Sequence, residues 1–277
     1  LHEQLITRLS RRSGIRVLDD STGQVRQATY LLRGRLRTAG ARGRLCVSLM
    51  LGGENRTVWS QIYEGDPSDI FAFCDELIER VDVDLRLQIN AFDGNRVAHL
   101  PEDRLSLSEL RSRAASAFYR GTMQSWEEAE RLLKRGKQLA IDDPMALAMM
   151  GEATVILNGA RYEDLDAEEA LLLEKDLDHA VEIAPRSDYV FWVRGLFRLN
   201  VRKDLTGAER DYQRVMSLSP AYAPGFELRG QIELASGKLE QATESLAHSV
   251  ALSEADPLLP YRLYILSVAN FCWQDYD

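Results

Sequence analysis

Two short segments with the same spacing decide the fold: residues 191–195 read FWVRG, and residues 226–230 read FELRG. Each segment ends in glycine, and Gly195 and Gly230 lie 35 positions apart. A looser copy, LAMMG, occupies residues 147–151. A repeat of about 34 residues is typical of α-solenoids, whose unit is a pair of antiparallel helices.

The residues that follow each glycine fit such a helical pair. Ala208 and Ala242 come twelve or thirteen positions later, where a small side chain lets the second helix approach the first. Tyr212 and Leu246 follow four positions after the alanines and therefore share their helix face. This pattern resembles the tetratricopeptide repeat, and we expect about four such hairpins over residues 105–277.

The resemblance implies that the first helix of each hairpin lines the inner wall of a superhelix. Tyr189 and Trp192 are suited to anchor a peptide there, because aromatic side chains are frequent at interfaces. The alternative is that both pack against the insertion near residues 158–166 of the first copy or against the next repeat. The predicted protein- or peptide-binding groove consists of Glu152, Tyr189, Trp192, Glu227 and Gln231.

The first part of the chain has a different period. Its apolar residues alternate in short runs separated by glycine-rich turns, which predicts an antiparallel meander rather than more helices. The fold class is therefore α+β: a small α/β domain over residues 1–92, a linker over 93–104, and an all-α tetratricopeptide-type solenoid over 105–277. Within the first domain we expect helices at 1–12 and 69–90, and strands at 15–18, 28–37, 44–51 and 57–63.

Several motifs in this domain resemble a known family. They are LITRLS at 5–10, GIRV at 14–17, YLLRGRLR at 30–37, VWSQIY at 58–63 and DIFAFCDE at 69–76. Their order resembles the TolB-like amino-terminal domain that precedes tetratricopeptide repeats in bacterial regulatory proteins. Domains of that family begin with a strand that carries a Leu-Pro-Phe motif, whereas this chain begins at the following helix. We therefore expect an N-terminally truncated domain.

The same resemblance implies a regulatory function. The paired domains of the family lie C-terminal to a class III adenylate cyclase domain or to a winged-helix DNA-binding domain of the CadC or ToxR type. The first hypothesis is the C-terminal part of such a cyclase, and the second is the effector half of such a transcriptional regulator. A free-standing adaptor or scaffold is the third. The full-length sequence would distinguish all three.

Charge and composition limit the ligands. The net charge is −9, and residues 101–277 hold 20 basic and 30 acidic residues, so direct nucleic-acid binding is not expected. This acidity favours a basic protein partner, or it only maintains solubility. The four histidines and three cysteines lack metal-ligand spacing, and no catalytic motif is found, so we expect neither metal, cofactor nor enzymatic activity. No run of 18 apolar residues is present. We expect a cytoplasmic location, or a periplasmic one if a membrane helix precedes the chain in its parent.

Two further surfaces are candidates. Arg33, Arg35 and Arg37 alternate along one predicted strand, so they share a face that either binds an anionic partner or is simply solvated. The helix predicted over residues 260–273 is largely apolar. It covers the last repeat, leads into further repeats, or forms a homodimer. A capping box is also predicted at Ser125, at the start of a helix over 126–141.

Overall fold

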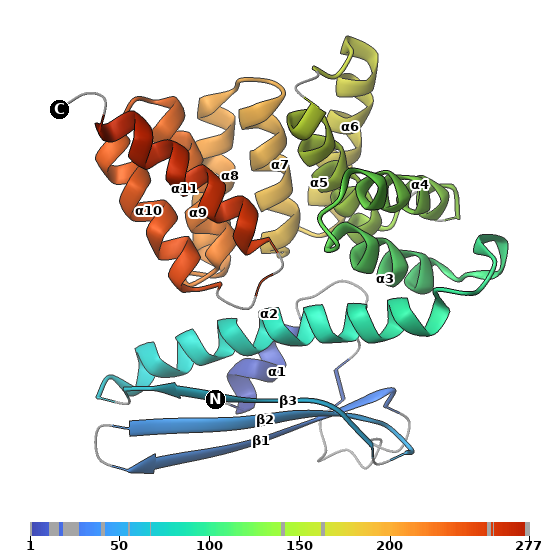
Figure 1. Ribbon diagram of the computed structural model, residues 1–277, viewed down its shortest axis with the longest axis vertical. Coiled ribbons are helices and arrows are strands. Elements are labelled where there is room, and N and C mark those ends of the chain that lie inside the picture. The colour runs from blue at the N-terminus through green and yellow to red at the C-terminus, as the bar shows by residue number, and fades with distance from the viewer. Residues whose placement is uncertain are drawn as a thin grey trace. The chain divides into compact units, whose positions relative to one another are not determined.

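The computed structural model has two compact units, residues 1–92 and 93–277. It describes residues 2–10, 17–18, 28–39, 42–54, 56–66, 68–139, 142–161, 164–253, 256 and 258–274. The fold class is the predicted α+β, with an antiparallel meander followed by an all-α solenoid of the tetratricopeptide type (Figure 1). Within the described residues, the helices are too short or too polar to span a membrane.

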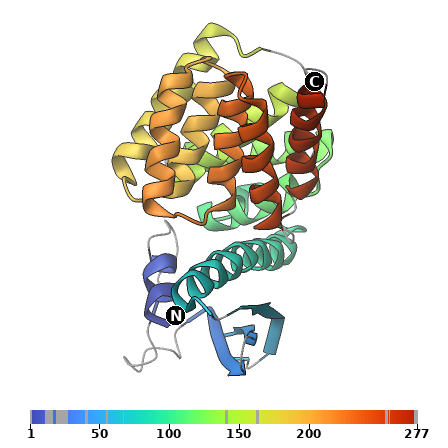
Figure 2. The ribbon, with the colours of Figure 1, turned by 90° about the vertical axis from the view of Figure 1, so that its left-hand side faces the viewer.

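In its described residues, the first unit contains a three-stranded sheet and two helices. Neighbouring strands are antiparallel in the order β1-β2-β3, with a bulge between Leu49 and Met50. One long helix lies along one face of the sheet (Figure 2). The elements are α1 (His2–Ser10), β1 (Tyr30–Ala39), β2 (Arg42–Leu51), β3 (Arg56–Gly65) and α2 (Ile70–Val97).

The alternation of buried and exposed residues along β2 explains how the long helix packs on the sheet. Leu45, Val47 and Leu49 are buried, while the residues between them point to the other face. They meet apolar side chains of α2 spaced at helical intervals, which gives the unit its own core. The buried cluster consists of Leu45, Val47, Leu49, Tyr63, Phe73, Leu77, Val81 and Leu85.

Two predicted elements differ from the structure. Val17 and Leu18 do not lie in a strand, and the rest of the predicted strand, 15–16, falls outside the described residues. The helix predicted over 69–90 continues to Val97, so it takes up the first part of the predicted linker. Gly94, in this extension, allows a close approach of the residues around Ser116, because a Cβ on the glycine would lie 2.7 Å from the Cβ of Ser116. The glycine thus marks a close helix contact instead of a linker.

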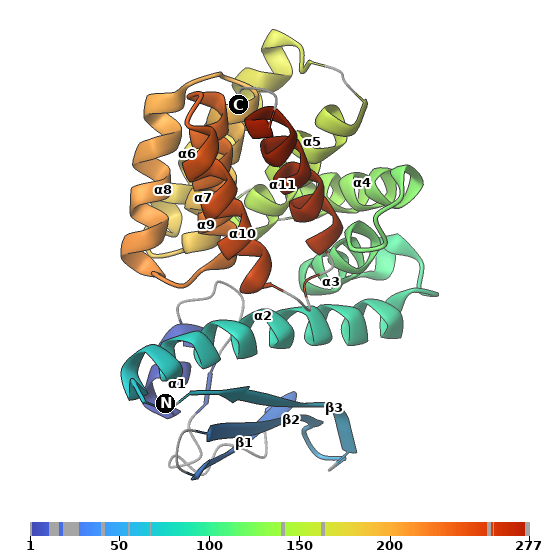
Figure 3. The same cartoon turned by 60° about the vertical axis from the view of Figure 1, so that its left-hand side comes forward.

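The second unit is a row of helical hairpins. Each first helix packs on its second helix in the pairs α3–α4, α5–α6, α7–α8 and α9–α10, and the hairpins stand side by side (Figure 1). A last helix, α11, packs on α10 (Figure 3). The elements are η3 (Glu102–Arg104), α3 (Leu107–Phe118), α4 (Met123–Leu139), α5 (Pro144–Arg161), α6 (Ala167–Ile183), α7 (Asp188–Asn200), α8 (Leu205–Leu218), α9 (Ala223–Ala235), α10 (Leu239–Ala251) and α11 (Leu259–Gln274).

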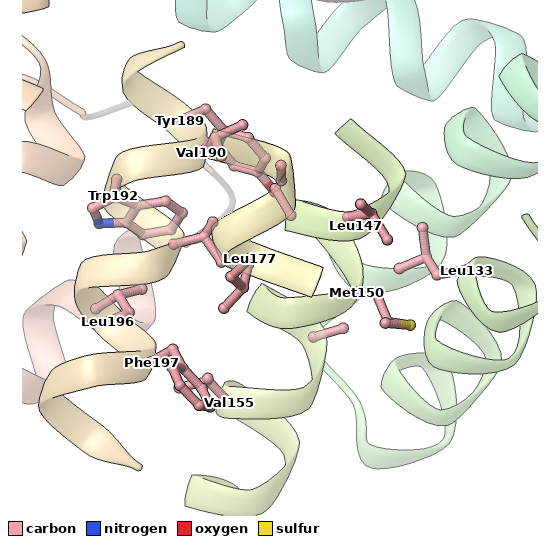
Figure 4. Packing of buried hydrophobic residues seen from close by; sticks show 14 of the residues in the cluster. Leu133, Leu147, Met150, Val155, Leu177, Tyr189, Val190, Trp192, Leu196 and Phe197 are labelled. Carbon is pink, nitrogen blue, oxygen red and sulfur yellow. The ribbon is translucent and has the colours of Figure 1, made fainter. Parts of the chain in front are cut away.

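The repeated glycines lie at close helix contacts. A Cβ on Gly230 would meet the Cγ of Leu246 at 2.5 Å, within the α9–α10 hairpin. A Cβ on Gly195 would meet Leu228 of the next hairpin at 2.5 Å. Apolar side chains fill the space between α5, α6 and α7 (Figure 4). Those labelled there include Leu147, Met150, Val155, Leu177, Val190, Leu196 and Phe197.

Two local predictions need correction. The extra residues near 158–166 are not all loop, because α5 has 18 residues and α6 has 17, whereas α7 and α9 have 13 each. The capping box predicted at Ser125 is wrong. That residue lies inside α4, and its hydroxyl accepts a hydrogen bond from the backbone N–H of Thr122 at 3.1 Å. The capping box that the structure shows is formed by Ser106 and Glu109 at the start of α3.

Candidate functional site

The predicted groove residues are all buried. Glu227 keeps 1% of its surface exposed, Trp192 keeps 2%, and Gln231 keeps 8%. Glu152 and Tyr189 keep 7% each. They do lie on the first helices α5, α7 and α9, as the repeat pattern requires. However, the structure offers no open peptide surface at these five residues, because other side chains of the chain cover them.

Glu152 and Tyr189 bind each other. The Tyr189 hydroxyl donates a hydrogen bond to Oε2 of Glu152, which links α7 to α5. The Tyr189 ring also packs against Trp192, with ring centroids 5.7 Å apart. Trp192 therefore contributes to the repeat core, as Figure 4 shows. The hydrogen bond of Tyr189 joins it to the preceding hairpin, whereas the alternative considered from the sequence was packing against the insertion or the next repeat.

Glu227 belongs to a buried ionic cluster. Nε of Arg262 donates to Oε2 of Glu227 at 2.8 Å, and a second guanidinium nitrogen lies 2.8 Å from Oδ2 of Asp256. Gln231 donates to Oε1 of Glu227 at 3.1 Å. One guanidinium thus serves two carboxylates. Burial raises the pKa of Glu227, the nearby Asp256 carboxylate raises it further, and Arg262 opposes both effects.

Trp192, Glu227 and Arg262 occupy equivalent positions in successive first helices. Glu227 is 35 residues from each of the other two, and each lies on the first helix of its hairpin or on α11. Helix α11 packs mainly on α10 and lightly on α9, much as α9 packs on α8 and α7. We conclude that α11 takes the place of a further first helix. The 35-residue spacing was a signal for Arg262 that the sequence analysis missed.

A second polar cluster joins α7 to α8. Asp211 is 2% exposed, and its carboxylate accepts hydrogen bonds from Arg194 and Arg198, the shortest being 2.6 Å and 2.8 Å. Asp178 on α6 binds the same two arginines from a half-exposed position. This cluster is not among the sites predicted from the sequence. Its only sequence signal is the spacing of the arginines, one helical turn apart.

The predicted arginine row lies on the sheet face turned away from the core. Arg33, Arg35 and Arg37 are exposed, and their partners across β2 alternate with its buried residues. Arg37 pairs in register with Arg44, and Arg44 forms an ion pair with Glu64 of β3. The geometry brings the guanidinium groups of these arginines and the Glu64 carboxylate onto one face, together with Arg42 of β2. Whether an anionic partner binds there remains a prediction.

The described surface hollows have charged walls. One of about 570 Å³ is lined by side chains that include Glu102, Glu130 and Lys134, and an ion pair joins Arg131 to Glu102. Small-molecule sites are usually apolar clefts with a few polar groups, so this hollow does not resemble one. Among the described residues, His, Cys, Asp and Glu side chains do not gather into a group of three that could hold a metal ion.

Comparison with known proteins gives distant likenesses only. No protein-family model matches the chain, and no curated protein matches it. Solved structures similar to it include MamA of Desulfovibrio magneticus RS-1, from its residue 41 onwards. It is 20% identical, the match covers 61% of this chain and 92% of that chain, and the TM-score is 0.37. Another is TTC0263, a thermophilic tetratricopeptide-repeat protein of Thermus thermophilus. It is 14% identical, the match covers 60% of this chain and 100% of that chain, and the TM-score is 0.39. The repeat assignment therefore rests on the chain's own hairpins and their 35-residue register.

Proposed function

We propose that the chain is a non-catalytic protein-interaction region with a solenoid scaffold. The observation that carries the proposal is the exposed surface of α6. Leu171 and Leu172 are 47% and 53% exposed, and the exposed carboxylates of Glu168 and Glu169 lie one turn before them. Apolar side chains rimmed by charge are typical of protein-binding surfaces. Such a surface suits a basic segment with apolar side chains.

The interior polar groups support a structural role over a catalytic one. Tyr189 binds Glu152, Asp211 binds two arginines, and Arg262 lies between two carboxylates. A general base or nucleophile must reach its substrate, whereas these groups are buried and engaged with one another. Their arrangement fixes the stacking of neighbouring helices.

Peptide binding at the five predicted groove residues remains a prediction, and it requires helices to move apart. Arg262 covers Glu227, so a ligand reaches Glu227 and Gln231 only if α11 moves away from α9. Tyr189 and Glu152 would have to separate in the same way at the α5–α7 contact. The α6 surface requires no such movement, and for this reason we favour it.

We also propose which kind of parent protein carries this region. The motifs of residues 1–92 resemble a TolB-like domain, and in that family the arrangement regulates an output domain. Our first candidate for the parent is a class III adenylate cyclase, of which this chain would be the C-terminal part. A winged-helix regulator of the CadC or ToxR type is the second candidate, and a free-standing adaptor is the third. The proposed location is cytoplasmic, or periplasmic if a membrane helix precedes the chain in its parent.

Affinity capture with the whole chain tests the α6 surface. The variant Leu171→Asp with Leu172→Asp adds charge at exposed positions and should leave the thermal unfolding temperature unchanged. Leu205→Asp on α8, where the leucine is 38% exposed, is the matched control. A protein captured by the wild type and the control but lost with the α6 variant supports the proposal. Equal capture by all three chains contradicts it.

A further inference from the structure

Strand β1 is an edge strand of the sheet in the first unit (Figure 1). Within the described residues it pairs with β2 alone, so the backbone N–H and C=O groups along its other side have no strand partner there. All of residues 33–39 are exposed. They include Leu36, which is 38% exposed although it lies directly opposite the buried Leu45. The second half of β1 is therefore accessible from both faces.

The charge of β1 is positive and is not balanced by nearby carboxylates. Arg33, Arg35 and Arg37 are exposed on one face, and β1 contains no acidic residue. Within the described residues none of the three forms an ion pair, whereas Arg44 of the neighbouring strand pairs with Glu64. The whole chain has 43 acidic and 34 basic residues, so a row of unpaired arginines is unexpected. These guanidinium groups are accessible to carboxylates of a partner.

The three arginines repeat at the pitch of an extended chain. Alternate residues of a strand are about 6.8 Å apart and share a face. A strand added beside β1 would have the same pitch, so acidic residues at its alternate positions would each lie opposite an arginine. On its other side Arg37 lies opposite Arg44, a like charge, which an added carboxylate would offset. The geometry thus matches a strand with alternating acidic residues.

We propose that the edge of β1 binds an extended acidic segment of another protein by strand addition. Only an extended chain can pair with the backbone groups of an edge, because a helix already uses its own. A second copy is disfavoured, since antiparallel pairing centred on Arg35 would bring arginines opposite arginines. The other edge strand, β3, offers no such row, because its charged residues Arg56 and Glu64 are each in an ion pair. This site is independent of the α6 surface.

Fluorescence anisotropy and hydrogen exchange of the whole chain at low salt test this proposal. The probe is a labelled eight-residue peptide in which Glu alternates with Val, and the control peptide has Gln in place of Glu. We expect the Gln peptide to bind about ten-fold more weakly. The Glu peptide should also slow amide exchange in residues 33–39, because strand addition occupies their outward N–H groups. No binding of the Glu peptide, or binding without slower exchange there, overturns the proposal. In the latter case charge alone explains the binding, as it would for phosphate groups of a nucleic acid or a lipid.

A variant of the chain separates the β1 edge from other basic positions. Arg33→Gln, Arg35→Gln and Arg37→Gln together should weaken binding of the Glu peptide about ten-fold. All three side chains are exposed, so circular dichroism should show an unchanged melting temperature. The matched control removes the same charge from exposed positions of the second unit, with Arg104→Gln, Arg186→Gln and Arg210→Gln. Equal weakening in both variants overturns the proposal, since only net charge would then matter. Unchanged binding by the β1 variant also overturns it, since the peptide would then use another site.

Discussion

Arg262 and Glu227 bind each other across 35 residues of sequence, with Nε and Oε2 2.8 Å apart and both side chains 1% exposed. Because the spacing equals the repeat length, the pair links two neighbouring first helices. It therefore reports directly on the attachment of α11 to the solenoid, and Asp256 completes the cluster.

Loss of the single guanidinium should cost much more than loss of one carboxylate. Arg262→Gln leaves Glu227 and Asp256 buried without a counter-charge, and we expect about 3–5 kcal/mol less stability. Glu227→Gln leaves Arg262 paired with Asp256, and we expect a loss of about 1 kcal/mol. Urea unfolding at pH 7 measures both values. Equal losses would show that Asp256 contributes little.

The raised pKa of Glu227 predicts a pH dependence. The folded chain holds this proton more tightly than the unfolded chain, whose pKa lies near the ordinary value of 4.5. The resulting stabilisation is fully present below that value and is lost as the pH rises through the folded pKa. The wild type should therefore lose stability relative to Glu227→Gln as the pH rises above 4.5. Paired urea titrations at several pH values measure the difference, and a constant difference would contradict the shift.

Gly230→Ala should destabilise the last hairpin. The new Cβ would lie 2.5 Å from Cγ of Leu246 and 3.2 Å from the carbonyl oxygen of Ala242. Overpacking of this kind costs about 1–3 kcal/mol. Gly159→Ala is the control, because that helical position has open space around it. There we expect a gain of up to about 1 kcal/mol. Similar effects at both sites would mean that helix propensity alone matters.

Asp211 and Asp178 bind the same two arginines but differ in exposure, at 2% and 48%. Asp211→Asn leaves Arg194 and Arg198 without their buried counter-charge, and we expect a loss of about 3–5 kcal/mol. Asp178→Asn should cost about 1 kcal/mol or less, because water screens the exposed pair. Thermal unfolding of the two variants compares them. A larger effect at Asp178 would contradict the burial argument.

Charge reversal on the sheet face should leave stability unchanged. Arg33→Glu, Arg35→Glu and Arg37→Glu together alter exposed side chains opposite the core, so we expect a change of about 0.5 kcal/mol or less per site. If the face binds an anionic partner, the triple variant loses that binding. If the triple variant still binds the anionic partner at low salt, the three arginines are an ordinary solvated surface.

Much of the local structure could be predicted from the sequence because its signals are periodic and short-range. The glycines at 195 and 230, with alanines one helix later, mark hairpins whose helices touch at small residues. The alternation at residues 45–49 likewise marks a strand with one buried face. The helix over 260–273 was also found, since α11 spans Leu259–Gln274.

Local signals failed where a distant contact decided the outcome. Gly94 is within the predicted linker, but it lies in α2, where the absence of a Cβ allows Ser112 and Ser116 of α3 to approach it closely. The capping box predicted at Ser125 lies about one turn after the true start of the helix, since α4 begins at Met123. The backbone N–H groups of Thr122 and Ser125 each donate to the side-chain hydroxyl of the other residue. Both errors concern hydrogen bonds or packing that the residue types alone leave open.

The sequence by itself determined the α+β class, the hairpins and which residues lie on first helices. Periodicity suffices for this, because it reflects the geometry of one helix or one strand at a time. Only the tertiary structure decided that Glu227 and Trp192 are covered. Their exposure depends on how closely the next first helix approaches, and Arg262, 35 residues after Glu227, makes that contact. The tertiary structure likewise decided which side of the apolar C-terminal helix is buried: Arg262, Ile265 and Ala269 are buried, whereas Leu263, Tyr264 and Phe271 are exposed.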